Sequence, residues 1–161
     1  LRLLDFGLSE IYCSKKHFNP NVASLFYKSP EILCGYDLYD CSLDIWSIGC
    51  IFAGLIFLKE PFFSGYDNIS QLTSIAMILG STSIYDLITT YNLTISDNLQ
   101  KAIGTHPSIP LDQFRHDRNE HLCRSDAIDL VSRMLTVNPA NRLTAKECMQ
   151  HVYFDSVRHL V

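Results

Sequence analysis

A carboxylate on a tight turn is the first group in the chain that could do chemistry. Asp5-Phe6-Gly7 follows the apolar run Leu1 to Leu4, which predicts the end of a buried strand. A carboxylate held on a tight turn after a strand is well placed to bind a metal ion, because hard cations prefer oxygen ligands. Taken alone the triplet is weak evidence, since Asp is also a common turn residue.

Three further motifs follow, and each contains charged or aromatic side chains. They are Ser29-Pro30-Glu31, then DIWSIG at residues 44–49, and finally NPANRLTAKECMQHVYF at residues 138–154. Each has an ordinary structural explanation when taken alone. Trp46 fits a core position, and Asp44 supplies the negative charge that favours a helix N-terminus. The order and spacing of all four motifs therefore matter more than any one of them.

The element that must position Asp44 is a long apolar helix. Residues 45–58, IWSIGCIFAGLIFL, form a run of 14 residues without a charge, followed by Lys59-Glu60. A bilayer-spanning helix needs about 20 residues, and shorter runs are more typical of buried core helices. Pro61 then cannot continue the helix. The pattern predicts a central helix at residues 43–58 that is buried on all sides, and no membrane partner.

Other segments also have helical periodicity, with apolar residues three and four positions apart. These segments are residues 68–79, 83–90, 125–135 and 144–151. Gly80 is expected to end the first, Ser125 to be the N-cap of the third, and Thr144 with Glu147 to form a capping box for the last. Residues 104–113 contain two prolines and fit an irregular surface loop. The predicted fold class is mainly α, in a single domain.

The composition is that of an ordinary globular domain. The 161 residues carry a formal net charge of -4, and 47% of them are hydrophobic. A balance of this kind gives no electrostatic footprint for nucleic acid, so no nucleic-acid partner is predicted. The six cysteines are scattered without a C-x-x-C pair, which favours reduced thiols inside a cell over a disulfide framework.

In their order and spacing the four motifs resemble the C-terminal lobe of a eukaryotic protein kinase. The resemblance covers essentially the whole chain and implies a partial kinase domain at residues 1–161, with a kinase-like fold limited to that lobe. It divides the chain into an activation segment at 5–31, the central helix, a helical insert at about 61–120 and C-terminal helices at 125–151. The insert is typical of the group that holds the cyclin-dependent, mitogen-activated and casein kinase II enzymes.

Two longer stretches narrow the resemblance. YDLYDCSLDIWSIGCIFAGLIFLKEPFFSGYDNISQL and DQFRHDRNEHL resemble the catalytic (alpha) subunit of casein kinase II. The resemblance implies a Ser/Thr kinase that uses ATP and Mg²⁺ and phosphorylates proteins with acidic residues near the target hydroxyl. It also implies a regulatory (beta) subunit as a candidate partner of the full-length protein, and a location in the nucleus and cytoplasm.

The resemblance assigns roles to four residues near the beginning of the chain. Asp5 matches the carboxylate that binds the Mg²⁺ ion bridging the ATP phosphates, and Leu4 matches a residue that lines the adenine pocket. Ser24 matches a hydroxyl that hydrogen-bonds the catalytic Asp. Lys28 matches a base that contacts the substrate. Taken alone, each would be an ordinary core, turn or surface residue.

Three further roles concern the framework around the site. Glu31 and Arg142 match an ion pair that ties the activation segment to the C-terminal helices. Asp44 matches a carboxylate that accepts backbone N–H bonds from the catalytic loop. In the kinase family that loop, with its base, precedes the Asp-Phe-Gly turn, as do the Gly-rich loop and the ATP-pairing Lys. No H-R-D triplet occurs in the chain, so no catalytic residue is assigned and a fragment, inactive by itself, is expected.

Three positions depart from the casein kinase II pattern. Phe6 stands where that family usually has Trp, and Asn21 and Leu25 stand where it usually has Arg. Two alternatives to a kinase stay open: a truncated product that binds substrates or partners without catalysis, and a degenerate kinase-like scaffold, which the missing Arg residues favour. The coding sequence upstream of Leu1 distinguishes them from a kinase, because a catalytic loop and a Gly-rich loop in frame would support catalysis.

Overall fold

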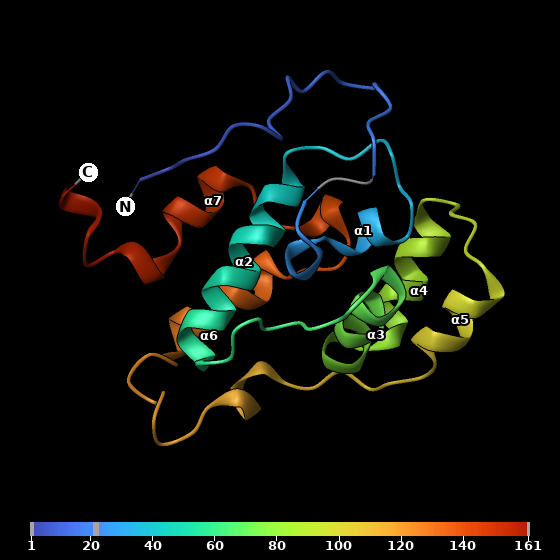
Figure 1. Ribbon diagram of the computed structural model, residues 1–161. Coiled ribbons are helices and arrows are strands. Elements are labelled where there is room, and N and C mark those ends of the chain that lie inside the picture. Colours follow the sequence, from blue (N-terminus) through green and yellow to red (C-terminus); the bar gives the residue numbers. More distant parts are fainter. Residues whose placement is uncertain (1, 21–22, 161) are drawn as a thin grey trace.

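The computed structural model describes residues 2–20 and 23–160, and Figure 1 shows their arrangement. These residues form helices and no strand, which confirms the predicted mainly α class. The α-helices are α1 (Pro30–Leu33), α2 (Ser42–Phe57), α3 (Asn68–Leu79), α4 (Ser81–Thr90), α5 (Asp97–Ile103), α6 (Ser125–Met134) and α7 (Ala145–Gln150). Short 3-10 helices lie between and after them: η1 (Leu25–Tyr27), η2 (Leu111–Phe114), η3 (Pro139–Asn141), η4 (Val152–Phe154) and η5 (Arg158–Leu160).

Helix α2 runs through the middle of the molecule, with α6 beside it and α3, α4 and α5 grouped on the other side (Figure 1). One face of α2 forms the core. Trp46 and Ala53 are fully buried there, and the Trp46 ring stacks on Phe63 with 5.6 Å between ring centroids. Large side chains from α3, including Leu72 and Ile75, complete the same core.

The opposite face of α2 corrects the prediction of a helix buried on all sides. Ile48, Ile51, Leu55 and Leu58 have between 46% and 62% of their surface exposed. Their three- and four-residue spacing puts them on one side of the helix. Among the described residues no element covers that side, so the uncharged run does not mean complete burial. Its apolar face remains open to a further part of a larger structure or to solvent.

The beginning of the chain also differs from the prediction. Residues 2–13 form no regular element, and Leu3 and Leu4 are 81% and 77% exposed, so a buried strand at Leu1 to Leu4 is wrong for the described part of that run. Leu1 itself lies outside the described residues. A strand needs a neighbouring strand to pair its backbone N–H and C=O groups. No such neighbour occurs in the described residues.

The helical insert folds against the core through α3 and α5. Helix α3 has the predicted bounds and ends at Gly80, whose φ of 88° turns the chain directly into α4. No single described helix is long and apolar enough to cross a bilayer, whereas α3 and α4, bent by 116°, meet that test only as a pair. Helix α5 was not predicted, because its seven residues contain few apolar positions.

The first residues of the two C-terminal helices, α6 and α7, can be compared with the predicted N-caps. Helix α6 begins at Ser125, but Arg124 is its N-cap, so the predicted N-cap is one residue too late. Helix α7 has the predicted capping box: the Thr144 N–H donates to Glu147 Oε2 at 2.8 Å, and the Glu147 N–H donates to Thr144 Oγ1 at 3.3 Å. These hydrogen bonds favour the ionised carboxylate and lower the pKa of Glu147.

Candidate functional site

A buried ion pair joins helix α1 to the loop before helix α7. Arg142, in the loop before α7, donates to both carboxylate oxygens of Glu31 in α1, at 2.8 and 2.9 Å. Both side chains are fully buried. The same guanidinium donates to the carbonyl oxygens of Ser42, Thr136 and Val137 at 2.9, 3.0 and 3.2 Å. Every face of this charge is therefore occupied, as a buried charge requires.

The ion pair sets the position of several elements at once. Glu31 lies in α1, Ser42 is the first residue of α2, and Thr136, Val137 and Arg142 lie in the connection between α6 and α7. The Arg142 guanidinium also lies over the Trp46 ring, 5.2 Å from its centroid. One cation thus joins α1, α2 and the C-terminal helices to the core. The structure brings the predicted pair Glu31 and Arg142 together in this way.

The segment before α1 is held by neighbours on α2 and α3. It contains η1, with Ser24 as its N-cap residue and Lys28 as its C-cap residue. The Ser47 hydroxyl on α2 donates to the Tyr27 carbonyl at 3.0 Å, and the Gln71 amide on α3 donates to the Phe26 carbonyl at 3.2 Å. These bonds fix the path of the backbone between the predicted residues Ser24 and Lys28.

The Lys28 side chain extends toward the first residue of α3. Its ammonium donates to the side-chain oxygen of Asn68 at 3.3 Å. No carboxylate pairs with this ammonium in the described part of the chain, so its charge is available to an anion from outside. Ser24 is exposed, and its side chain makes no capping bond to η1. Of the two predicted residues on this well-anchored segment, Ser24 is therefore exposed and Lys28 is partly buried.

The Asp5 turn stands apart from that segment. Asp5 has a φ of 61°, and its Oδ1 accepts the Gly7 N–H at 3.1 Å, which leaves the other oxygen unused. The Ser9 hydroxyl closes the turn by donating to the Phe6 carbonyl at 2.7 Å. Asp5 and Leu4 are both exposed. The structure gives neither residue a hydrogen bond or ion pair with Ser24, Lys28 or Asp44.

A single carboxylate oxygen at Asp5 suits Mg²⁺ chemically, because this ion prefers hard oxygen ligands and commonly takes only one or two from the protein. Within residues 2–20 and 23–160, no group of three His, Cys, Asp or Glu residues could form a metal site. Asp5 can therefore contribute one ligand, and the others would come from phosphate, water or further protein groups.

Asp44 lies at the surface in the first turn of α2, and no described residue hydrogen-bonds its carboxylate. Partial burial without a compensating donor raises its pKa. A carboxylate with these properties would gain stability from N–H donors.

Substituting Asp44 with Asn is expected to stabilise the folded chain at pH 7. A raised folded-state pKa means that the folded state binds more protons than the unfolded state, so Asp44 costs stability as pH rises from about 3.8, its ordinary value, through its folded pKa. The gain from Asp44→Asn should therefore be present at neutral pH and vanish below about 3.8. Thermal unfolding at pH 7 and pH 3 measures it.

Asp67 provides a control of opposite sign. It is the N-cap of α3, and hydrogen bonds from Ser70 lower its pKa. Its contribution to stability is present at neutral pH and lost as pH falls through its folded pKa. Asp67→Asn should therefore destabilise at pH 7 and have little effect at low pH. If Asp44→Asn and Asp67→Asn changed the free energy of unfolding equally at pH 7, the opposite pKa shifts of the two carboxylates would be contradicted.

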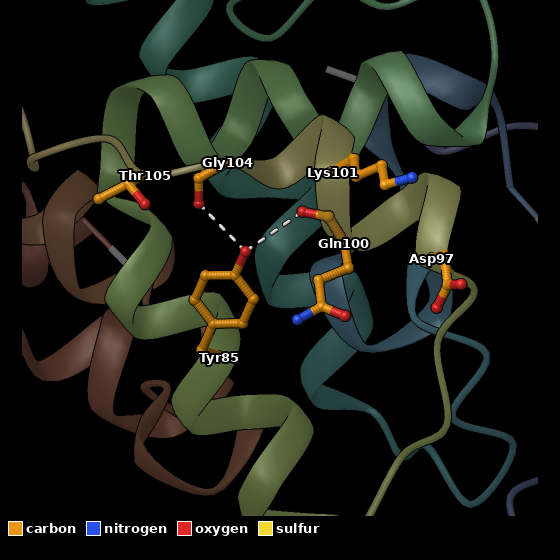
Figure 2. Close-up of a pocket in the computed structure, with 6 residues that line it drawn as sticks. All are labelled: Tyr85, Asp97, Gln100, Lys101, Gly104 and Thr105. Atoms are coloured by element: carbon orange, nitrogen blue, oxygen red, sulfur yellow. Dashed lines mark hydrogen bonds between the residues drawn. The ribbon is translucent and has the colours of Figure 1, made fainter.

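A shallow pocket lies on the insert, away from these residues. Figure 2 shows its lining by Tyr85, Asp97, Gln100, Lys101, Gly104 and Thr105. The Tyr85 hydroxyl points at the end of α5 and lies 3.3 Å from the Gln100 carbonyl oxygen and 3.1 Å from the Gly104 carbonyl oxygen. This hydroxyl joins α4 to α5, and none of the predicted site residues lines the pocket.

Comparison with known families accounts for this arrangement. Residues 1–154 match the sequence profile of the protein kinase domain. The chain belongs to the protein kinase domain family. In this kinase domain the helices described above are those of a C-terminal lobe, and the Arg142–Glu31 pair spans that lobe from the segment around α1 to the C-terminal helices.

Three residues that position the segment 24–28 of this kinase domain were not predicted: Ser47, Glu60 and Gln71. Gln71 is fully buried in α3, but its sequence neighbours Ser70 and Leu72 do not mark it as a core position. Ser47 and Glu60 have no local signal either. Their partners, Tyr27 in both cases, lie 20 and 33 positions away.

Proposed function

We propose that this kinase domain belongs to an ATP- and Mg²⁺-dependent Ser/Thr kinase of the casein kinase II type, which phosphorylates proteins at sites with nearby acidic residues. The match of residues 1–154 to the protein kinase domain supports phosphoryl transfer. The narrower assignment rests on the resemblance of residues 36–72 and 112–122 to the casein kinase II catalytic subunit. The proposal extends to a regulatory (beta) subunit as partner and to action in the nucleus and cytoplasm.

Asp5 would hold the Mg²⁺ ion through its free carboxylate oxygen, and Leu4 beside it would meet the adenine of ATP. Bound Mg²⁺ neutralises charge on the phosphates during transfer. The Gly7 N–H already orients the Asp5 carboxylate, so the side chain does not have to be ordered when the ion binds. Ser24 would help to orient the catalytic Asp supplied by the loop upstream.

Lys28 would supply the attraction for acidic substrates. Its ammonium hydrogen-bonds only a neutral amide among the described residues, and its segment is fixed by bonds from α2 and α3. An ammonium attracts a carboxylate without requiring the bidentate geometry of Arg. This arrangement favours a preference for acidic peptides that depends on one cation.

The test uses the complete gene product that contains these 161 residues, with labelled ATP and a Ser peptide flanked by acidic residues. Phosphoryl transfer is expected, and Asp5→Ala should reduce it by roughly 10²-fold or more, because a metal ligand is lost. Asp97→Ala, at the surface of α5, serves as the matched control and should retain activity. Peptide binding without any transfer would instead support the scaffold alternative.

A weak preference for an acidic residue immediately after the target is expected, because the family's two Arg residues are absent. Leu25 lies partly buried in η1, and Asn21 lies outside the described residues. Substituting Arg at both positions should sharpen the preference for Asp over Ala after the Ser by several-fold, since an exposed charge pair contributes roughly 0.2–1 kcal/mol. If the native protein preferred Asp over Ala after the Ser as strongly as the family does, residues elsewhere would have to recognise the acidic side chain.

A further inference from the structure

A tyrosine side chain provides the third anchor of the segment that carries Lys28. The Tyr27 hydroxyl donates to Glu60 Oε1 at 2.9 Å. The other two anchors, from Ser47 and Gln71, act on backbone carbonyl oxygens. The bond to Glu60 differs from them because its acceptor is a carboxylate, and charge-assisted hydrogen bonds are about twice as strong as neutral ones.

The end of α2 places Glu60 where it can reach Tyr27. Leu58 adopts the left-handed conformation, with φ 52° and ψ 40°, and the Lys59 N–H donates to the Gly54 carbonyl at 3.1 Å. The chain thereby returns alongside the last turn of α2. The Glu60 carboxylate lies against the backbone of Gly54, where a Cβ would be only 2.2 Å from Glu60 Oε2.

Gly54 therefore provides the space that the carboxylate occupies. Glycine is a poor helix former, and Gly54 lies inside a helix with an ordinary helical backbone, so conformational freedom does not explain it. The adjacent cation does not neutralise Glu60, because the Lys59 ammonium lies over the rings of Phe62 and Phe114, at 5.1 and 5.4 Å from their centroids. The hydrogen bond to Glu60 also raises the pKa of Tyr27.

We propose that Glu60 is a positioning residue for the peptide substrate: its carboxylate, seated in the space left by Gly54, holds the Tyr27 hydroxyl and so fixes the segment that presents Lys28 to acidic side chains. This inference rests on the proposed function. Its physical basis is preorganisation, because a segment ordered before the peptide arrives does not lose further conformational entropy on binding. In this role Glu60 acts through the Tyr27 hydroxyl and needs no contact with the peptide or the phosphoryl group.

Steady-state kinetics of the complete gene product with an acidic peptide test the proposal. Glu60→Ala and Tyr27→Phe should each raise KM for the peptide about three- to ten-fold, with a much smaller change in kcat, as expected for loss of a charge-assisted hydrogen bond. Glu60→Gln keeps an oxygen acceptor and should raise KM less. Tyr85→Phe is the matched control, because its hydroxyl joins α4 to α5 and should not affect KM.

Gly54→Ala provides a second, independent variant. The added methyl group should displace the Glu60 carboxylate and raise KM to the same extent as Glu60→Ala, although Glu60 is still present. The double variant Gly54→Ala, Glu60→Ala should be no worse than either single change, because both remove one interaction. Additive effects of the two substitutions would overturn the proposal, as would an equal rise in KM for Tyr85→Phe.

Hydrogen exchange separates this inference from the proposed function, since it requires no catalysis. The Tyr27 and Lys28 amides donate to the Ser24 and Leu25 carbonyl oxygens at 3.0 and 3.2 Å, and they should exchange faster in Glu60→Ala and Tyr27→Phe but not in Tyr85→Phe. An inactive native protein with this exchange pattern would reject the kinase function and leave the positioning by Glu60 intact. Unchanged exchange would overturn the positioning itself.

Discussion

Replacing Arg142 with Ala is expected to lower the free energy of unfolding by about 3–5 kcal/mol, because the buried Glu31 carboxylate would lose its partner. The same change would leave three carbonyl oxygens, those of Ser42, Thr136 and Val137, without their donor. A typical domain is stable by only about 5–15 kcal/mol, so the loss is a large fraction of the total. The three elements joined by Arg142 would separate together.

Denaturant unfolding followed through Trp46 fluorescence measures this effect, since the indole lies directly beneath the guanidinium. Arg133→Ala is the matched control: Arg133 pairs with Asp129 on α6, both side chains are about half exposed, and the change should cost less than about 1 kcal/mol. The double variant Glu31→Ala, Arg142→Ala should lose less than the sum of its single changes, because no charge is then left unpaired. A cost of Arg142→Ala equal to that of the control would contradict the role of the pair.

The 161-residue chain by itself is expected to transfer no phosphoryl group. It contains no H-R-D triplet and no Gly-rich loop, and its one His-Asp pair, His116-Asp117, belongs to the insert. Loss of a general base alone typically costs 10²–10⁴-fold in rate. The absence of the groups that bind the nucleotide phosphates adds to that loss.

Incubation of the purified chain with labelled ATP and an acidic peptide tests this expectation. The reference is the same chain with Asp5→Ala, which lacks the metal ligand as well. Equal, background-level signals are expected from both. Transfer by the native chain above the Asp5→Ala reference would show that residues 1–161 contain a catalytic base that the kinase motifs do not reveal.

Structural features that depend only on residues close together in the chain could be predicted from the sequence by itself. The bounds of α3 agree with the prediction because apolar spacing and the terminal Gly80 act within one or two helical turns. The capping box of α7 agrees for the same reason, since Thr144 and Glu147 are three residues apart. The association of Glu31 with Arg142 came from the family resemblance, because no local signal relates residues 111 positions apart.

Only the tertiary structure decided which faces are covered and which distant side chains meet. The apolar run of α2 has no charge on any side, yet Ile48 and Leu55 are exposed because burial depends on what packs against a helix and not on its own composition. The same reason explains the exposed Leu4 beside Asp5. The Tyr27–Glu60 bond likewise depends on how the chain returns after α2. The sequence by itself determined helix α3 and the capping box of α7, because those signals act between near neighbours; packing between distant segments determined the site.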